Sequence, residues 1–273
     1  MKNLEAICVP VATAGLLLTA SFRAEATDIT WTNTVSGVWN AAANWNPNTV
    51  PGATDTAIIT NAGVTVTLDI SPTVGGIILG DNGPGTVTLS LAGQTLTLNG
   101  PLTVNPSGSF TVDSGTLAGN PNAVLSGTIG WTAGFLEGIL TLAPGSTLNI
   151  NNSANNHTLQ GCTFTNNGTV AWASGTIRGG NGTAIYNYGL WDAQDDSIWN
   201  NLNGGTGVFN NFGTFRKSGG GLRVPTTRYS RTQWHSTSLP VCWTCRMAPT
   251  AWNWLFRVAA ISPVVTSPPI NSG

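Results

Sequence analysis

Three stretches of the chain repeat one phrase: Thr163-Phe-Thr-Asn-Asn-Gly-Thr-Val-Ala-Trp172, Ala184-Ile-Tyr-Asn-Tyr-Gly-Leu-Trp-Asp-Ala193 and Val208-Phe-Asn-Asn-Phe-Gly-Thr-Phe-Arg-Lys217. Each phrase reads as an aromatic-bearing strand, an Asn/Gly turn and a second short strand. Gly168, Gly189 and Gly213 occupy the same point in each phrase, so the phrase recurs at a nearly constant spacing. Repetition at such a spacing predicts a solenoid, whose units bury their apolar faces against their neighbours.

Residues 63–149, which precede these phrases, alternate apolar and Thr or Ser side chains with a period of two. Examples are Val64-Thr-Val-Thr-Leu68 and Thr86-Val-Thr-Leu-Ser-Leu91, and turns containing Gly, Asn and Pro separate such runs. Alternation of this kind is typical of strands with one buried face. A Gly-Thr-apolar triplet opens several strands: Gly85-Thr-Val, Gly115-Thr-Leu, Gly127-Thr-Ile, Gly168-Thr-Val and Gly175-Thr-Ile.

The repeats and the alternation together predict an all-β fold, a single-stranded parallel β-helix. An antiparallel sandwich would also contain short alternating strands, but its hairpins need two-residue turns, and few of the turns here are so short. With about 21 residues per coil, the chain is expected to form about nine coils, divided into a Trp-rich cap at 27–62 and repeats at 63–221. At a strand spacing of about 4.8 Å, such a rod is about 40 Å long.

Charged residues are scarce, at 8% of the chain compared with about 25% in typical soluble domains. No Lys or Arg lies between Arg23 and Arg178, so the predicted rod lacks a basic surface for phosphate groups. The sequence therefore predicts no nucleic-acid partner. It makes no prediction of the oligomeric state.

The N-terminal segment 1–26 has the three parts of a secretory signal peptide. Lys2 supplies positive charge, the stretch 6–20 is mainly apolar, and Ala24-Glu-Ala26 is a small-x-small cleavage site. An N-terminal membrane anchor is the alternative, but the apolar run is short for a span of about 20 residues. We therefore expect a secreted or cell-surface protein with no transmembrane span after cleavage.

A Trp-rich pattern follows the signal peptide. It comprises Trp31, Gly37-x-Trp39, Ala43-Asn-Trp45, Val50-Pro51 and Asp55-x-Ala57. This pattern resembles the start of secreted bacterial parallel β-helix repeat proteins, often described as autotransporter-like or adhesin-like, and the resemblance extends over residues 27–221. It implies a right-handed parallel β-helix at the cell surface or in the medium, without established catalytic residues.

The tryptophans of this pattern have two interpretations. Because terminal repeats of a solenoid must cover an exposed core, Trp31, Trp39 and Trp45 are expected to form an N-terminal cap. Alternatively, the three indoles form a carbohydrate-binding platform on which sugar rings stack.

The asparagines of the repeated phrases are expected to be structural. Asn166, Asn187 and Asn210 are the predicted members of an amide ladder, in which side chains stack along parallel strands. His157 is expected in a polar turn.

No motif in the chain identifies a reaction. If the protein were an enzyme like the pectin-lyase-like β-helix proteins, its candidate catalytic residues would be Asp192, Asp196 and Arg178. Asp192 and Asp196 share a strand parity and could converge for hydrolysis, whereas a lyase needs a base such as Arg178. The alternative is a solvated acidic turn, which at most binds Ca²⁺. No other metal and no cofactor is expected.

The composition changes at about Leu222. Residues 222–273 contain five Arg and no Asp or Glu, and the period-two alternation ends. One hypothesis is that this basic tail is translated out of frame, because shifted codons permit a sequence like that of the repeats. The alternative is a genuine C-terminal module, in which Cys242-Trp-Thr-Cys245 has the spacing of redox and metal sites. In either case the last coil, near Phe215, is expected to have an exposed edge.

Two functions from different classes remain. The first is a non-catalytic structural or adhesive rod. The second is a β-helix that binds or cleaves a cell-surface or environmental polysaccharide. Aromatic side chains exposed in a row would favour sugar binding, whereas aromatics buried coil over coil would favour the rod.

Overall fold

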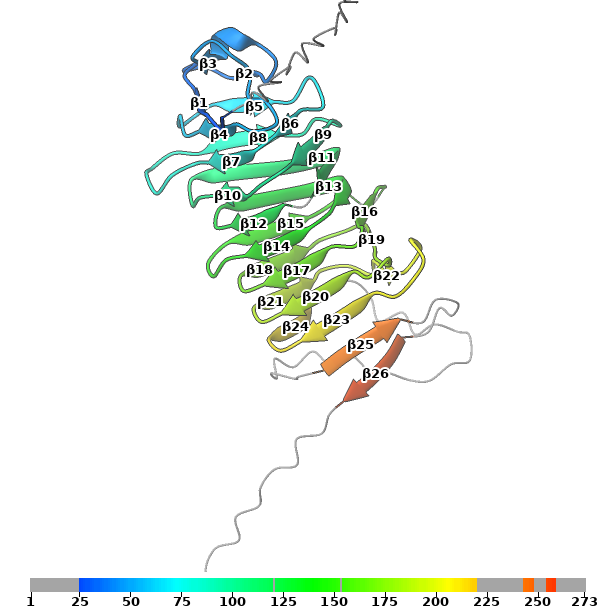
Figure 1. Cartoon of the computed structure of the whole chain (residues 1–273). Coiled ribbons are helices and arrows are strands. Elements are labelled where there is room, and N and C mark those ends of the chain that lie inside the picture. Colours follow the sequence, from blue (N-terminus) through cyan, green and yellow to red (C-terminus); the bar gives the residue numbers. More distant parts are fainter. Residues whose placement is uncertain (1–24, 120, 153, 220–242, 248–253, 259–273) are drawn as a thin grey trace, which may run out of the picture.

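A computed structural model describes residues 25–119, 121–152 and 154–219, together with the backbone of two strands at 243–247 and 254–258. Its strands follow one another in coils, and equivalent strands of successive coils pair in parallel (Figure 1). The predicted parallel β-solenoid is therefore confirmed. It has about eight turns, close to the nine expected.

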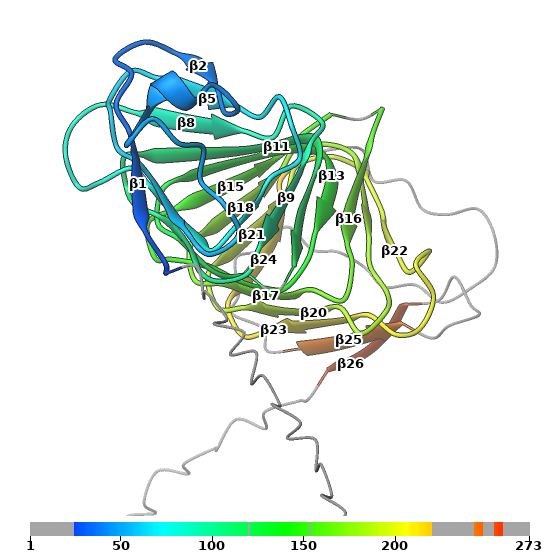
Figure 2. The same cartoon turned by 45° about the horizontal axis from the view of Figure 1, so that its top comes forward.

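Each full coil contributes one strand to each of three stacks, which enclose the core (Figure 2). The first stack contains β1 (Asp28–Trp31), β4 (Thr56–Ile59), β7 (Gly76–Leu79), β10 (Leu102–Val104), β12 (Asn122–Leu125), β14 (Ile139–Leu142), β17 (Thr163–Asn166), β20 (Ala184–Asn187) and β23 (Val208–Asn211). Parallel stacking thus begins at β1, within the segment expected to be the cap.

The second and third stacks share two long strands that turn the corner between them. The second stack contains β2 (Gly37–Val38), β5 (Thr65–Thr67), β8 (Val87–Ser90), the first parts of β11 (Gly108–Gly119) and β13 (Thr128–Leu136), β15 (Thr147–Ile150), β18 (Thr169–Trp172), β21 (Leu190–Ala193) and β24 (Thr214–Lys217). The third contains β6 (Thr73–Val74), β9 (Thr95–Leu98), the last parts of β11 and β13, β16 (Asn156–Leu159), β19 (Thr176–Arg178) and β22 (Trp199–Asn200).

The core consists of columns of inward side chains, one from each coil. Phe164, Ile185 and Phe209 are direct partners in successive strands of the first stack, and all three are buried. They continue a column of smaller apolar residues: Ile29, Ala57, Ile77, Leu102, Ala123 and Leu140. The three repeated phrases are therefore consecutive coils, stabilised by burial of apolar surface between neighbours.

Glycines form the corner between the first and second stacks. A Cβ atom built on Gly189 would lie 2.1 Å from the carbonyl oxygen of Gly168, and one built on Gly213 would lie 2.4 Å from that of Gly189. Because no side chain fits there, the coils can approach closely only through glycine. The Thr that follows Gly168 or Gly127 points outward from the second stack, which explains the Gly-Thr-apolar triplets at these corners.

The N-terminal end of the core is closed by a short irregular segment. The 3₁₀-helix η1 (Ala42–Asn44) leads into β3 (Trp45–Asn46), which pairs antiparallel with the outer edge of β1. Figure 1 shows this segment, in blue, at the start of the solenoid.

At the opposite end, β25 (Trp243–Met247) pairs antiparallel with β23, and β26 (Trp254–Val258) pairs with β25. The edge of the first stack is therefore covered, so the expectation of an exposed edge on the last coil is wrong for β23. No described strand pairs with the outer side of β24, which contains Phe215. The signal peptide, apart from its last two residues, and Cys242 lie outside the described residues, as does most of the tail. Within the described ranges, no helix is long and apolar enough to cross a membrane.

Candidate functional site

Asp192, the first catalytic candidate, is bound by an arginine of the next coil. Strands β21 and β24 place Asp192 and Arg216 side by side. The Arg216 Nε donates to Oδ1 of Asp192 at 2.9 Å, and Nη2 donates to Oδ2 at 2.7 Å. The amide of Gln194 also donates to Oδ2, at 3.0 Å. These contacts hold the pKa of the Asp192 carboxyl well below its usual range, so the group is a saturated ion-pair partner rather than a proton donor.

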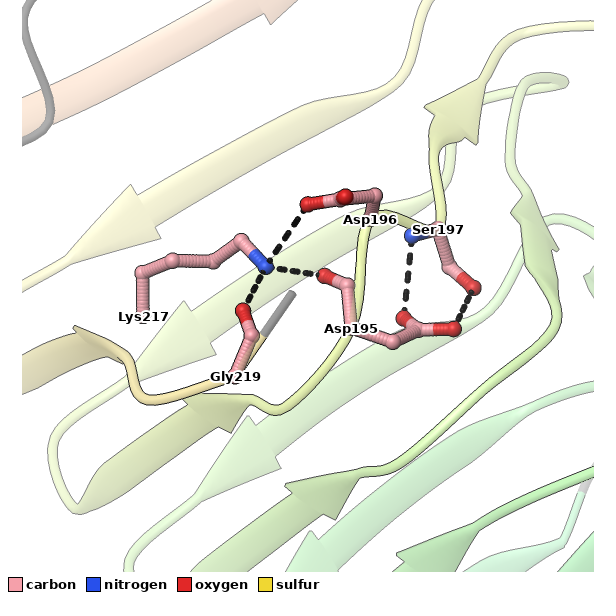
Figure 3. A network of polar contacts seen from close by, with 5 residues as sticks. All are labelled: Asp195, Asp196, Ser197, Lys217 and Gly219. Atoms are coloured by element: carbon pink, nitrogen blue, oxygen red, sulfur yellow. Dashed lines mark hydrogen bonds and ion pairs between the residues drawn. The ribbon is translucent and has the colours of Figure 1, made fainter. Parts of the chain in front are cut away.

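Asp195 and Asp196 belong to a second, separate polar network (Figure 3). The ammonium of Lys217 lies 3.2 Å from Oδ1 of Asp196 and donates to the carbonyl oxygens of Asp195 and Gly219. The Asp195 carboxylate accepts hydrogen bonds from the backbone N–H of Ser197 at 2.9 Å and from its hydroxyl at 2.6 Å. The contacts of Lys217 join the loop between β21 and β22 to the last coil, and the Asp195–Ser197 bonds lie within that loop.

The three catalytic candidates lie in different elements: Asp192 in β21, Asp196 in the loop that follows β21, and Arg178 in β19. Asp192 is ion-paired with Arg216 and Asp196 with Lys217, so each carboxylate of the expected pair is bound by a different cation of the last coil. Arg178 lies in β19 of the third stack, between Thr158 and Asn200 of the neighbouring coils, whereas Asp192 lies in the second stack.

Within the described ranges, no three or more His, Cys, Asp and Glu side chains lie together in a group that could hold a metal ion. His157 is buried in β16, not in a turn as expected, and its ring forms a T-shaped pair with that of Trp131, with ring centroids 5.1 Å apart. Burial lowers the pKa of His157 and raises that of the Cys162 thiol, so both side chains are held neutral as part of the core.

The three N-terminal tryptophans are buried. Trp31 and Trp39 are 0% exposed and Trp45 is 1% exposed. Trp45 packs edge-to-face against Trp31 and Trp39, with ring centroids 5.1 and 4.8 Å apart, and its indole N–H donates to the carbonyl of Trp39 at 2.8 Å. These rings offer no face to a sugar. The prediction of a carbohydrate-binding platform at these residues is therefore wrong, and the indoles close the end of the core.

An amide ladder runs through the last three coils. Nδ2 of Asn166 donates to Oδ1 of Asn187, and Nδ2 of Asn187 donates to Oδ1 of Asn211, both at 2.6 Å. The same amides donate to the carbonyl oxygens of Leu190 and Thr214 in the following coils. The third member is thus Asn211 and not Asn210, which pairs with Tyr186 on the outer face. Asn211 could have been found from the sequence, because it precedes its glycine by two residues, as Asn166 and Asn187 do.

The outer face of the second stack carries a feature that the alternation alone did not locate. One outward residue from each of six consecutive coils is a Thr or Ser, and the six are direct strand partners. We call this set the hydroxyl column: Thr65, Thr88, Ser109, Thr128, Thr147 and Thr169. A shorter column runs beside it through Thr67, Ser90 and Thr111.

Exposed aromatic side chains are few in the described ranges. Tyr188 and Phe212 occupy the same corner of successive coils, are 53% and 47% exposed, and stack with ring centroids 5.0 Å apart. By contrast, Phe164, Trp191 and Phe209 are buried and contact one another edge-to-face. The aromatics of the repeated phrases thus mainly join coils, rather than forming an exposed row.

Comparisons with protein-family models, curated proteins and solved structures found no significant match to this chain.

Proposed function

We propose that this chain is an exported, non-catalytic β-solenoid that serves as a structural or adhesive rod outside the cell. The observation that carries the proposal is that the side chains capable of chemistry or sugar binding are occupied by contacts within the solenoid. Asp192 and Asp196 are ion-paired to the last coil, the N-terminal tryptophans are buried, and the asparagines of the phrases bond one coil to the next. The two aspartates that were candidates for catalysis thus bind to a neighbouring coil.

The location and the family of this rod are part of the same proposal. The signal-peptide pattern at 1–26 and the Trp-rich pattern at 27–62, which resembles the start of secreted bacterial β-helix repeat proteins, both support an extracellular or cell-surface position. The low charge of the body and its regular Thr- and Ser-bearing surface suit a rod that acts through length and repetition.

Polysaccharide binding is a second candidate function, favoured by two features of the outer surface. The stacked Tyr188 and Phe212 rings and the hydroxyl column both face outward and suit contact with sugars. Cleavage is less well supported, because both aspartate candidates are neutralised by cations of the last coil.

The proposal is tested by incubating the full secreted chain with insoluble neutral and acidic polysaccharides. We expect some of these solids to retain the protein, with no soluble sugar released after prolonged incubation. The Asp192→Asn variant should be retained equally well. Release of oligosaccharides by the native chain, and its loss in Asp192→Asn, would show instead that the protein is an enzyme.

A further inference from the structure

We propose that the hydroxyl column of the second stack binds an extended, uncharged polysaccharide that lies along the stacking axis, with one sugar ring per coil. This inference rests on the proposed function of an adhesive rod and assigns its binding surface.

The hydroxyl column is continuous over six coils. Thr88 pairs with Ser109, Ser109 with Thr128 and Thr128 with Thr147, with no shift of register between them. The column ends where Thr169 pairs with Leu190. Parallel strands lie about 4.8 Å apart, so six positions span roughly 24 Å. An extended glycan advances by about one such spacing per ring, and each ring could therefore meet one hydroxyl.

The hydroxyls of the column are available to a partner. None of the six makes a hydrogen bond to another group in the part of the chain that the structure describes, and none is sealed from solvent as an unpartnered buried atom. Other hydroxyls already have hydrogen-bond partners within the protein: that of Thr183 donates to the carbonyl of Leu159, and that of Ser90 donates to the carboxylate of Asp113. A hydroxyl both donates and accepts, as do the hydroxyls of a sugar.

The charge pattern selects an uncharged partner. The column itself contains no ionisable side chain. Strand β11 contains one acid, Asp113, whose carboxylate accepts hydrogen bonds from the hydroxyl of Ser90 and the backbone N–H of Ala92. Arg178 lies on the third stack, and Arg216 and Lys217 are bonded to the acids of the preceding coil and lie beyond Leu190. An anionic glycan would find no cation along the column, whereas a neutral one meets no unpaired charge.

Thr→Val substitutions test the column, because valine keeps the β-branched shape and strand preference while removing the hydroxyl. The test variant combines Thr88→Val, Thr128→Val and Thr147→Val. The matched control combines Thr103→Val, Thr141→Val and Thr165→Val, which are outward, half-buried positions of the first stack. Both full-length variants should retain the native circular dichroism spectrum and melt at or above the wild-type temperature.

Binding is measured by calorimetry with β-1,4-linked glucose oligomers of increasing length. Wild-type affinity should rise with each ring until the column is filled and then level off. The column variant should bind at least about tenfold more weakly, as expected for several lost hydrogen bonds, whereas the control should bind like the wild type.

Two outcomes would overturn the inference. One is equal binding by the column variant and the wild type; the other is tighter binding of polygalacturonate than of the neutral oligomers. If both triple variants still adhere to insoluble polysaccharide, the adhesive rod stands and only the hydroxyl column is wrong. Failure of the wild type to adhere to any surface would count against the adhesive function itself.

Discussion

Replacing Gly189 by alanine is expected to destabilise the protein by about 3 kcal/mol or more, enough to unfold much of its C-terminal half. The added Cβ would lie 2.1 Å from the carbonyl oxygen of Gly168 and 2.9 Å from the carbonyl carbon of Asn167. Both obstacles are backbone atoms of the preceding coil, which cannot rotate away as a flexible side chain can. Gly213 of the next coil lies directly on the other side of Gly189. Thermal and urea unfolding of the variant measure the loss.

Gly130→Ala is the matched control for this prediction. At Gly130 the nearest atoms to an added Cβ belong to the side chain of Thr111, 3.7 Å away, which is an ordinary contact. The change also lowers the entropy of the unfolded chain, so we expect stability within about 1 kcal/mol of the wild type. Equal effects of the two substitutions would show that the coils do not meet at Gly189 as described.

The second large effect is expected from Asn187→Leu, in the middle of the amide ladder. The Asn187 side chain accepts a hydrogen bond from Asn166 and donates to Asn211 and to the carbonyl oxygen of Thr214. Leucine has nearly the same shape, and Leu142 fills the equivalent position one coil before Asn166. The loss should therefore come from buried amide groups deprived of partners, at about 3 kcal/mol in total. Urea unfolding measures it.

The Asn210→Thr variant distinguishes the observed ladder, which contains Asn211, from the predicted one, which contains Asn210. The Asn210 side chain lies on the outer face, and its amide donates one long hydrogen bond, to the carbonyl oxygen of Ile185 at 3.4 Å. Threonine suits an outward, half-buried strand position, so the change should alter the free energy of unfolding by less than about 0.5 kcal/mol. A larger loss in Asn210→Thr than in Asn187→Leu would contradict the observed ladder.

The repeated phrases allowed the last three coils to be predicted in detail, because their glycines set the alignment. Relative to those glycines, Asp192 and Arg216 hold the same position in successive phrases, so even their ion pair was readable in the sequence. The ladder was misassigned at Asn210 because two adjacent asparagines precede Phe212, and only the spacing to Gly213 separates them.

Earlier coils were less predictable because their lengths vary. Ala123 pairs with Leu140 across a short coil, whereas Ile29 pairs with Ala57 across a much longer one. A fixed period therefore cannot tell which Thr residues share one column, and the hydroxyl column emerged only from the strand registers. The antiparallel strand on β23 likewise lies in a tail without period-two alternation, so nothing local in the sequence indicated its pairing.

The central claim is that Asp192 joins two coils and does not act in catalysis. It is tested most directly by a double-mutant cycle on Asp192 and Arg216. Asp192→Asn, Arg216→Gln and the double variant are compared with the wild type by urea unfolding. The Asp192 side chain is only 5% exposed, so Arg216→Gln alone leaves a buried carboxylate without its cation. Adding Asp192→Asn removes that charge and should recover part of the lost stability. We expect a coupling of about 1 kcal/mol between the two sites. Additive losses, with no coupling, would contradict the pairing of these coils and the structural role of Asp192.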